Sequence, residues 1–131
     1  MRILVIDDEP LVGVMLSNYL SNKGHNIVSV SSPKDALSAM NPAIFDVIIT
    51  DYKMVPTNGI EAAKKIRATG YDGRIILMSA CCDSTNSELA AAGIDVFLEK
   101  PFNLDKVSSL IEDLCGVKKK VEPEYAECVG F

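Results

Sequence analysis

Phe45-Asp46-Val47-Ile48-Ile49-Thr50-Asp51 is an apolar run that ends on an aspartate, and it is the most informative segment of this 131-residue chain. A run of this kind, rich in β-branched residues from Val47 to Thr50, is typical of a strand buried on both faces of a parallel sheet. Three other apolar runs also end on polar residues: 3–6 before Asp7 and Asp8, 75–78 before Ser79, and 96–98 before Glu99 and Lys100. The pattern predicts parallel strands that carry their polar side chains at one end.

Strand-like and helix-like segments alternate through five cycles, which predicts an α/β fold with helices on both faces of a five-stranded parallel sheet. Right-handed crossovers allow few strand orders, and the common solution is the flavodoxin-like, doubly wound order 2-1-3-4-5. The least apolar strand, at residues 25–30, is placed at a sheet edge. Five helices are expected, at residues 10–23, 33–40, 59 onward, 88–92 and 104–114, and Ser32 is the predicted N-cap of the second.

The composition limits the class of protein. A hydrophobic fraction of 48% with 24% charged residues is ordinary for a globular domain, and a net charge of −5 argues against direct nucleic-acid binding. Every apolar run is too short for membrane insertion. The spacing of the four cysteines fits neither a zinc site nor a disulfide framework, so reduced thiols in a cytoplasmic protein are expected. The role of Cys81 and Cys82 is left open.

One domain is expected over residues 1–116. Periodicity ends at Gly116, and residues 117–131 are interpreted as a C-terminal tail or the start of a linker. The chain is therefore either a stand-alone domain or a fragment of a larger protein.

The polar residues at the strand ends are expected to converge. In a parallel sheet the carboxyl ends of the strands open onto one crevice, where open α/β folds place their chemistry. Asp7, Asp8 and Asp51 would meet there with Ser79 and Lys100. Three neighbouring carboxylates disfavour one another's ionised forms. We therefore expect a bound divalent cation, with the lysine as a further counter-charge.

Mg²⁺ suits this set of residues, because it commonly takes one or two carboxylates together with waters and a phosphate. Asp8 and Asp51 are the expected direct ligands, Asp7 acts directly or through a water, and the backbone carbonyl of Lys53 reaches in from the following loop. An ionised aspartate is also a nucleophile toward phosphorus, and it forms an aspartyl phosphate. An isolated aspartate after a strand is most often a helix N-cap, so Asp7 or Asp8 is expected to cap the first helix as well.

Phosphoryl transfer depends mainly on positioning and on neutralising charge at the phosphoryl oxygens. Lys100 and the hydroxyl of Ser79 are the groups expected to hold those oxygens.

These motifs, in this order and spacing, resemble the receiver (CheY-like) domain of bacterial two-component response regulators over roughly residues 2–115. The matching features are the acidic pair Asp7-Asp8, the phosphoacceptor position Asp51 with Tyr52-Lys53-Met54 and Gly59 beyond it, Met78-Ser79-Ala80, and Lys100-Pro101-Phe102. Phe97, three positions before the lysine, occupies the place of the family's switch aromatic.

The resemblance implies a signalling switch in a phosphorelay. A histidine kinase or histidine phosphotransfer protein would phosphorylate Asp51 with Mg²⁺. Ser79 would then move toward the phosphoryl group and Phe97 would turn inward. The face built from the fourth helix, fifth strand and fifth helix would change its affinity for a downstream protein target. The domain would not be an enzyme beyond promoting its own phosphorylation and dephosphorylation.

Two departures from the family pattern concern the loop after Asp51. Val55 stands between Met54 and Pro56, where the family usually has proline directly after the methionine. Lys53 places a long cation two residues after the phosphoacceptor, at a position that helps to control water attack in the family. We hypothesise that Lys53 alters the lifetime of the aspartyl phosphate.

Two other functions compete with the switch. An aspartyl-phosphate phosphohydrolase usually carries Asp-x-Asp on its first strand, whereas this strand ends in Asp7-Asp8. A nucleotide- or flavin-binding module of the same architecture would carry a glycine-rich phosphate loop, and neither common form of that loop follows any strand. The phosphohydrolase is kept as the alternative.

Overall fold

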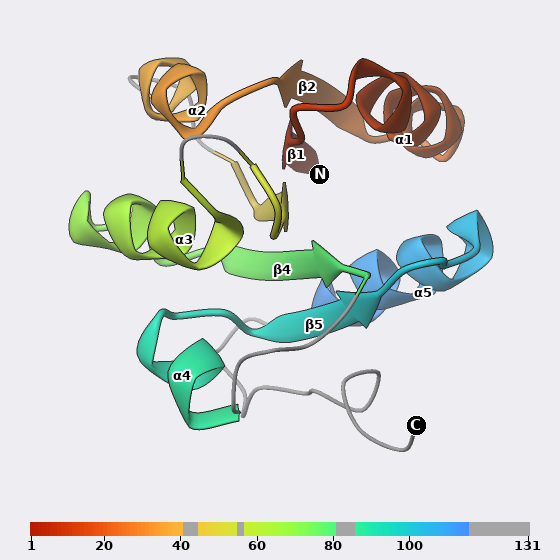
Figure 1. Cartoon of the computed structure of the whole chain (residues 1–131). Coiled ribbons are helices and arrows are strands. Elements are labelled where there is room, and N and C mark those ends of the chain that lie inside the picture. The colour runs from red at the N-terminus through yellow and green to blue at the C-terminus, as the bar shows by residue number, and fades with distance from the viewer. Residues whose placement is uncertain (41–44, 55–56, 81–85, 116–131) are drawn as a thin grey trace.

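The computed structural model describes residues 1–40, 45–54, 57–80 and 86–115 (Figure 1). In chain order they form β1 (Arg2–Ile6), α1 (Pro10–Asn22), β2 (Asn26–Val30), α2 (Pro33–Ala39), β3 (Val47–Asp51), α3 (Gly59–Ala68), β4 (Arg74–Ser79), α4 (Asn86–Ala91), β5 (Val96–Glu99) and α5 (Leu104–Cys115). The predicted alternation is confirmed. The predictions on Val55, Pro56, Cys81, Cys82 and residues 117–131 lie outside the described residues.

The five strands form one parallel sheet in the order β2-β1-β3-β4-β5, as predicted. β3 is buried along its whole length, as its unbroken apolar sequence requires. β2 lies at the edge, and Val28 on it is 41% exposed. Asp51 is paired in register with Met78, so the carboxyl ends of β3 and β4 lie next to each other.

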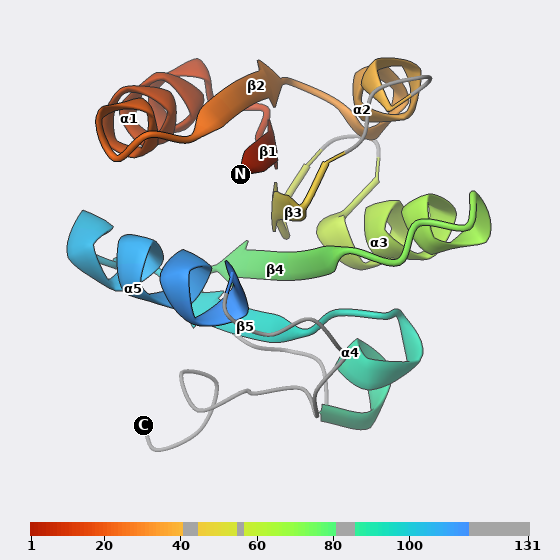
Figure 2. The ribbon, with the colours of Figure 1, turned by 180° about the vertical axis from the view of Figure 1, so that it is seen from behind.

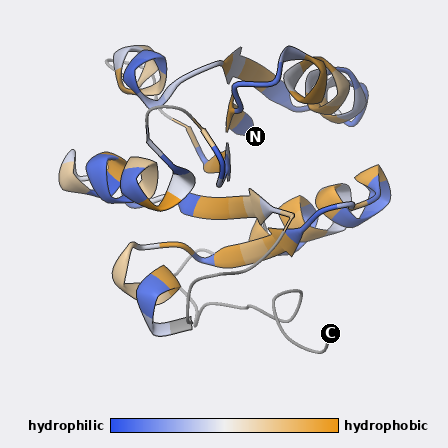
Figure 3. Ribbon diagram, viewed as in Figure 1, coloured by the Kyte–Doolittle hydropathy of each residue, from blue (hydrophilic) through white to orange (hydrophobic). Residues whose placement is uncertain are grey.

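Helices cover both faces of the sheet. α1 and α5 lie on one face, while α2, α3 and α4 lie on the other (Figures 1 and 2). Alternate strand residues point to opposite faces, so the sheet divides the core into two clusters of buried apolar side chains. The strands are largely hydrophobic in Figure 3, whereas the helices carry both hydrophilic and hydrophobic residues. No helix of the described residues is long and apolar enough to cross a bilayer.

Side-chain caps fix where several helices begin, α2 and α3 among them. The Ser32 hydroxyl accepts a hydrogen bond from the Asp35 N–H at 3.1 Å, as predicted, and the Asn58 side chain accepts one from the Glu61 N–H at 2.9 Å. The expected aspartate cap of α1 is wrong. Glu9 is its N-cap and makes no side-chain cap bond. Proline at the first helical position has no N–H to satisfy, which lowers the need for a cap.

Arg67 ties the loops at the amino ends of β4 and β5 together. Its guanidinium donates to the carbonyl oxygens of Tyr71, Gly73 and Gly93 and to the buried Asp95 carboxylate, at 2.7–3.1 Å. Asp95 also accepts the Ile75 N–H at 3.0 Å. This network fixes the end of the sheet that lies opposite the acidic strand ends.

Candidate functional site

Three carboxylates meet at the carboxyl ends of β1 and β3. Asp7, Asp8 and Asp51 each offer an oxygen that lies within 4.8 Å of the other two, and we call this group the acidic cluster. Asp7 and Asp51 are buried, whereas Asp8 is exposed. Neighbouring residues of the same type therefore differ in environment, because Asp7 continues the line of the strand while Asp8 lies in the turn that leads to α1.

Lys100 supplies the counter-charge. Its ammonium nitrogen lies 2.9 Å from a carboxylate oxygen of Asp51 and 4.0 Å from one of Asp7. The lysine follows β5, while the two carboxylates follow β3 and β1. Four residues from three strand ends therefore form one charged group in which one cation faces three anions.

The acidic cluster opens into a pocket of about 260 Å³, which we call the acidic pocket. Ser79, at the end of β4, lies in its wall together with Asp51 and Lys100. The complete lining is Asp8, Glu9, Asp51, Lys53, Ser79, Ala80 and Lys100. The side chains predicted to hold a phosphoryl group therefore face the same space as the predicted phosphoacceptor.

The surroundings of Asp7 raise the pKa of its carboxyl. Burial raises the pKa of its carboxyl to about 6, and the neighbouring charges of Asp51 and Asp8 add to this rise. The Glu9 N–H, which donates to this carboxylate at 2.8 Å, and the charge of Lys100 act in the opposite direction. Burial is the largest cause of the rise, and these two groups offset only part of it.

The residues present fit a divalent metal ion. One carboxylate oxygen of Asp7, Oδ2, is buried and has no hydrogen-bond partner among the described residues. A buried oxygen acceptor left in this way is costly unless a donor or a cation satisfies it. Carboxylate oxygens at mutual distances below 4.8 Å are the hard ligands that Mg²⁺ takes.

Gly59, the first residue of α3, packs closely against the end of β3 at Asp51. A Cβ atom added at this glycine would lie 2.3 Å from the carbonyl oxygen of Asp51, so any side chain would displace the strand end. The Gly59 N–H donates to the Tyr52 carbonyl at 2.7 Å, and the Tyr52 N–H donates to the Met78 carbonyl at the same distance. These two hydrogen bonds connect the backbone that follows Asp51 to β4 and to the start of α3.

The remaining predicted site residues lie close to this group. Phe97 is 1% exposed and packs in the core cluster beneath α3 and α4. Lys53 lines the acidic pocket and forms an isolated bridge with Asn58. Its role as a carbonyl ligand and that of Phe97 as a switch stay predictions.

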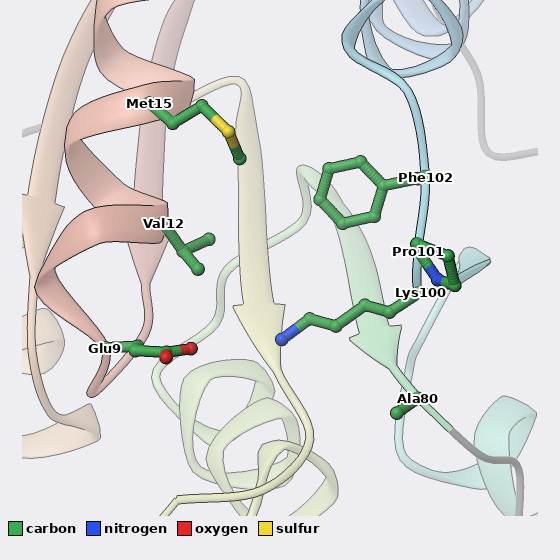
Figure 4. Close-up of a pocket in the computed structure, with 7 residues that line it drawn as sticks. All are labelled: Glu9, Val12, Met15, Ala80, Lys100, Pro101 and Phe102. Atoms are coloured by element: carbon green, nitrogen blue, oxygen red, sulfur yellow. The ribbon is translucent and has the colours of Figure 1, made fainter.

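Sequence reasoning assigned no role to Glu9. It also missed an apolar groove beside the acidic pocket, which is lined by Glu9, Val12, Met15, Ala80, Lys100, Pro101 and Phe102 (Figure 4). One feature of the sequence could have indicated the groove: α1, PLVGVMLSNYLSN, contains no charged residue. A surface helix normally has a charged or polar outer face.

Comparison with known proteins agrees with this geometry. The family model of the response regulator receiver domain matches residues 3–112. The response regulator MprA of Mycobacterium leprae is 32% identical over the whole chain and 57% of its own length. The transcriptional regulatory protein TcrA of Mycobacterium tuberculosis is 27% identical over 86% of this chain and 45% of its own. The chain thus spans about half the length of these relatives.

Solved structures show the same fold. The response regulator TrrA of Thermotoga maritima, determined in complex with Mg²⁺ and BeF, is 32% identical with a TM-score of 0.75, covering 86% of this chain and 97% of its own. Chemotaxis response regulator CheY4 of Vibrio cholerae is 26% identical with a TM-score of 0.79 and the same coverage.

Proposed function

This chain belongs to the response regulator receiver family, a family of two-component signalling, and on that basis we propose that Asp51 is its phosphoacceptor. The single observation that carries this assignment is the position of Asp51. It is 6% exposed, lies within 4.8 Å of two further carboxylates and is paired with Lys100 at 2.9 Å. A buried carboxylate in this setting has a fixed orientation, which favours attack on a phosphoryl group that is held in place.

The side chains of the acidic pocket divide the work of phosphoryl transfer. An oxygen of Asp51 attacks phosphorus, while the ammonium group of Lys100 and the hydroxyl of Ser79 hold the phosphoryl oxygens. Asp7, Asp8, Asp51 and the backbone carbonyl of Lys53 would hold Mg²⁺. When bound there, Mg²⁺ supplies positive charge that offsets the charge on the phosphoryl oxygens.

Relatives that are response regulators imply a histidine kinase partner and a downstream target in general. We propose that a histidine kinase or histidine phosphotransfer protein phosphorylates Asp51, in the cytoplasm. The added charge then alters contacts of the face formed by α4, β5 and α5, with Ser79 and Phe97 as the moving parts. Phe97 lies in β5 and packs against the core beside α4, so a rotation of its ring would be felt on that face.

Intact mass after incubation with acetyl phosphate and Mg²⁺ tests the assignment. The wild type gains one phosphoryl group and Asp51→Asn gains none. Asp72→Asn, which changes an exposed aspartate in the turn before β4, is labelled like the wild type. Labelling of Asp51→Asn at the rate of the wild type would show that another residue accepts the phosphoryl group.

The phosphohydrolase alternative is not favoured, because the family is one of signalling domains. We propose that the chain does not turn over phosphate esters. Incubation with p-nitrophenyl phosphate is expected to release no more nitrophenol than the amount of protein present. Sustained multiple turnover that is lost in Asp51→Asn would revive the alternative.

A further inference from the structure

The outer edge of β2 is an uncharged border of the sheet. Figures 1 and 2 show β2 at one border of the molecule, with α1 on one face of the sheet and α2 on the other. Within the described residues, β2 pairs with β1 alone. Proteins commonly protect such an edge with a charged side chain, a proline or a bulge. The sequence of β2, NIVSV, has neither a charge nor a proline, and its pairing with β1 is regular over all five residues.

Apolar side chains that are open to solvent gather on the same border. In the part of the chain that the structure describes, every exposed large apolar side chain lies on α1 or β2: Leu11, Val14, Met15 and Val28. Val14 is 56% exposed and lies on the β2 side of α1, since it lines a pocket together with Ser29 and Val30. An exposed apolar patch commonly marks an interaction surface. We call Val14 together with Ile27, Val28 and Ser29 the neutral edge.

The backbone of β2 determines which groups face outward. The Asn26 N–H donates to the carbonyl of the residue before β1 at 2.9 Å, and the Val30 carbonyl accepts the N–H of the residue after β1 at 3.1 Å. The backbone groups of successive strand residues point to alternate sides, so those of Val28 also point toward β1. The N–H and C=O groups of Ile27 and Ser29 therefore point away from the sheet.

We propose that the neutral edge binds a second copy of this chain, with the two β2 strands antiparallel about a two-fold axis at Val28. Ile27 of each chain then lies opposite Ser29 of the other, and each of these two pairs exchanges two backbone hydrogen bonds. This arrangement uses every outward-facing backbone group of the two residues. Within β2, a register centred on Ile27 or on Ser29 would use only half of them, so the residue at the axis is defined.

The side chains agree with this arrangement. Val28 faces the Val28 side chain of the second chain in a non-hydrogen-bonded pair, the type in which opposite side chains lie closest. The contact covers a side chain that is 41% exposed in the single chain. The two α1 helices lie on the same face of the joined sheet, where Val14 of each chain points toward the other helix. Because α1 carries no charged residue, no charge on these helices opposes their approach.

Charge favours a second copy at this border. Each chain has a net charge of −5, so two copies repel each other over much of their surface. Self-association therefore needs a surface on which like charges do not meet. Neither α1 nor β2 carries a charge, and α2, on the opposite face, carries one lysine and one aspartate, whose charges balance.

The neutral edge is separate from the surfaces assigned so far. It lies on the border opposite α4 and β5 (Figure 1). No residue that lines the acidic pocket belongs to β2. The joined chains therefore keep their acidic pockets and their faces formed by α4, β5 and α5 free. Self-association does not require phosphorylation of Asp51, so it does not rest on the proposed function.

Sedimentation equilibrium of the whole chain in reducing buffer, from about 10 μM to about 1 mM, tests the pairing over the range expected for a small interface. The mean mass of the wild type is expected to rise with concentration from the 14.2 kDa of one chain toward twice that value. Val28→Lys and Val28→Glu each place like charges opposite one another and should weaken the association roughly tenfold or more. An equimolar mixture of the two variants should restore it, because opposite charges then meet at the axis.

Ser87→Lys is the matched control, because it adds the same charge at an exposed residue of α4 on the opposite border. Its association should stay within about twofold of the wild type. A wild-type mass that stays at 14.2 kDa over the whole range would overturn the proposal. Association that survives in both Val28 variants, or that is lost in Ser87→Lys, would place the contact elsewhere and overturn it too. So would a mixture of the two Val28 variants that does not associate, because no two-fold axis then passes through this residue.

Discussion

Lys100→Met tests how the acidic cluster is held together in the absence of metal. The substitution keeps most of the aliphatic stem and removes the only cation within 4.0 Å of Asp7 and Asp51 that the described residues provide. The acidic cluster then keeps three carboxylates without the ion pair that Lys100 makes with Asp51. We expect the variant to be less stable than the wild type when no divalent cation is present.

The size of the effect follows from the geometry. At 2.9 Å, two unit charges attract by about 6 kcal/mol at an effective dielectric constant of about 20. The side chain of Lys100 is 25% exposed, so solvent offsets much of this attraction. Exposed pairs contribute up to about 1 kcal/mol, and breaking a fully buried pair costs about 3 kcal/mol or more. An intermediate loss of about 2 kcal/mol is expected.

Urea unfolding measures this loss. With a denaturant slope of about 2 kcal/mol per molar, the midpoint of Lys100→Met falls by about 1 M without divalent cation. Saturating Mg²⁺ is expected to narrow the difference to below about 1 kcal/mol, because it adds the positive charge that the variant lacks. Lys65→Met, at an exposed lysine of α3, serves as the control and changes stability by less than about 0.5 kcal/mol.

An equal loss of stability with and without Mg²⁺ would refute this reasoning. It would mean that Lys100 stabilises the fold through the packing of its stem and that the acidic cluster does not depend on its charge. A variant as stable as the wild type in metal-free buffer would refute it as well.

Three further predictions concern single positions. Asp8→Asn removes the exposed carboxylate of the acidic cluster, so Mg²⁺ should no longer raise the unfolding midpoint measured in urea. Lys53→Asn removes a long side chain from the wall of the acidic pocket, and phosphate release after acetyl phosphate is withdrawn should become several-fold faster. Arg67→Met removes the guanidinium that lies 2.9 Å from the buried Asp95 carboxylate and leaves Arg74 at 3.8 Å, and it should cost about 3 kcal/mol in urea unfolding.

Each of these three predictions would be contradicted by a specific result. Stabilisation of Asp8→Asn by Mg²⁺ to the same extent as the wild type would place the metal elsewhere. An unchanged rate of phosphate release in Lys53→Asn would remove the hypothesis that this residue sets the lifetime. A loss below about 1 kcal/mol in Arg67→Met would show that Arg74 alone can hold Asp95.

The sheet and the acidic cluster were predictable because both depend on local sequence. β3 had to be buried on both faces, since it has no polar alternation, and parallel strands bring their carboxyl ends to one edge. From this alone, Asp7, Asp8 and Asp51 could be placed beside Lys100. The difference between the buried Asp7 and the exposed Asp8 could not be predicted, because it depends on where β1 stops and α1 starts.

The apolar groove and the Arg67 network depend on tertiary placement. Arg67 finds its partners in two loops that follow it by 4 to 28 positions, and nothing in the composition of α3 indicates which carbonyl groups they present. The groove exists because α1 and the segment after β5 leave a space between them. The uncharged sequence of α1 indicated that its outer face is unusual, but not what lies opposite.

Lys100 lines both the acidic pocket and the apolar groove, so a change in its contacts affects both. A phosphoryl group on Asp51 adds about 1.5 to 2 negative charges where one lysine already faces three carboxylates. We expect Lys100 to shift its contacts toward the phosphoryl oxygens. Because the same side chain lines the apolar groove, that movement also changes the groove wall. The unphosphorylated and the phosphorylated protein should therefore differ in the shape of this groove wall.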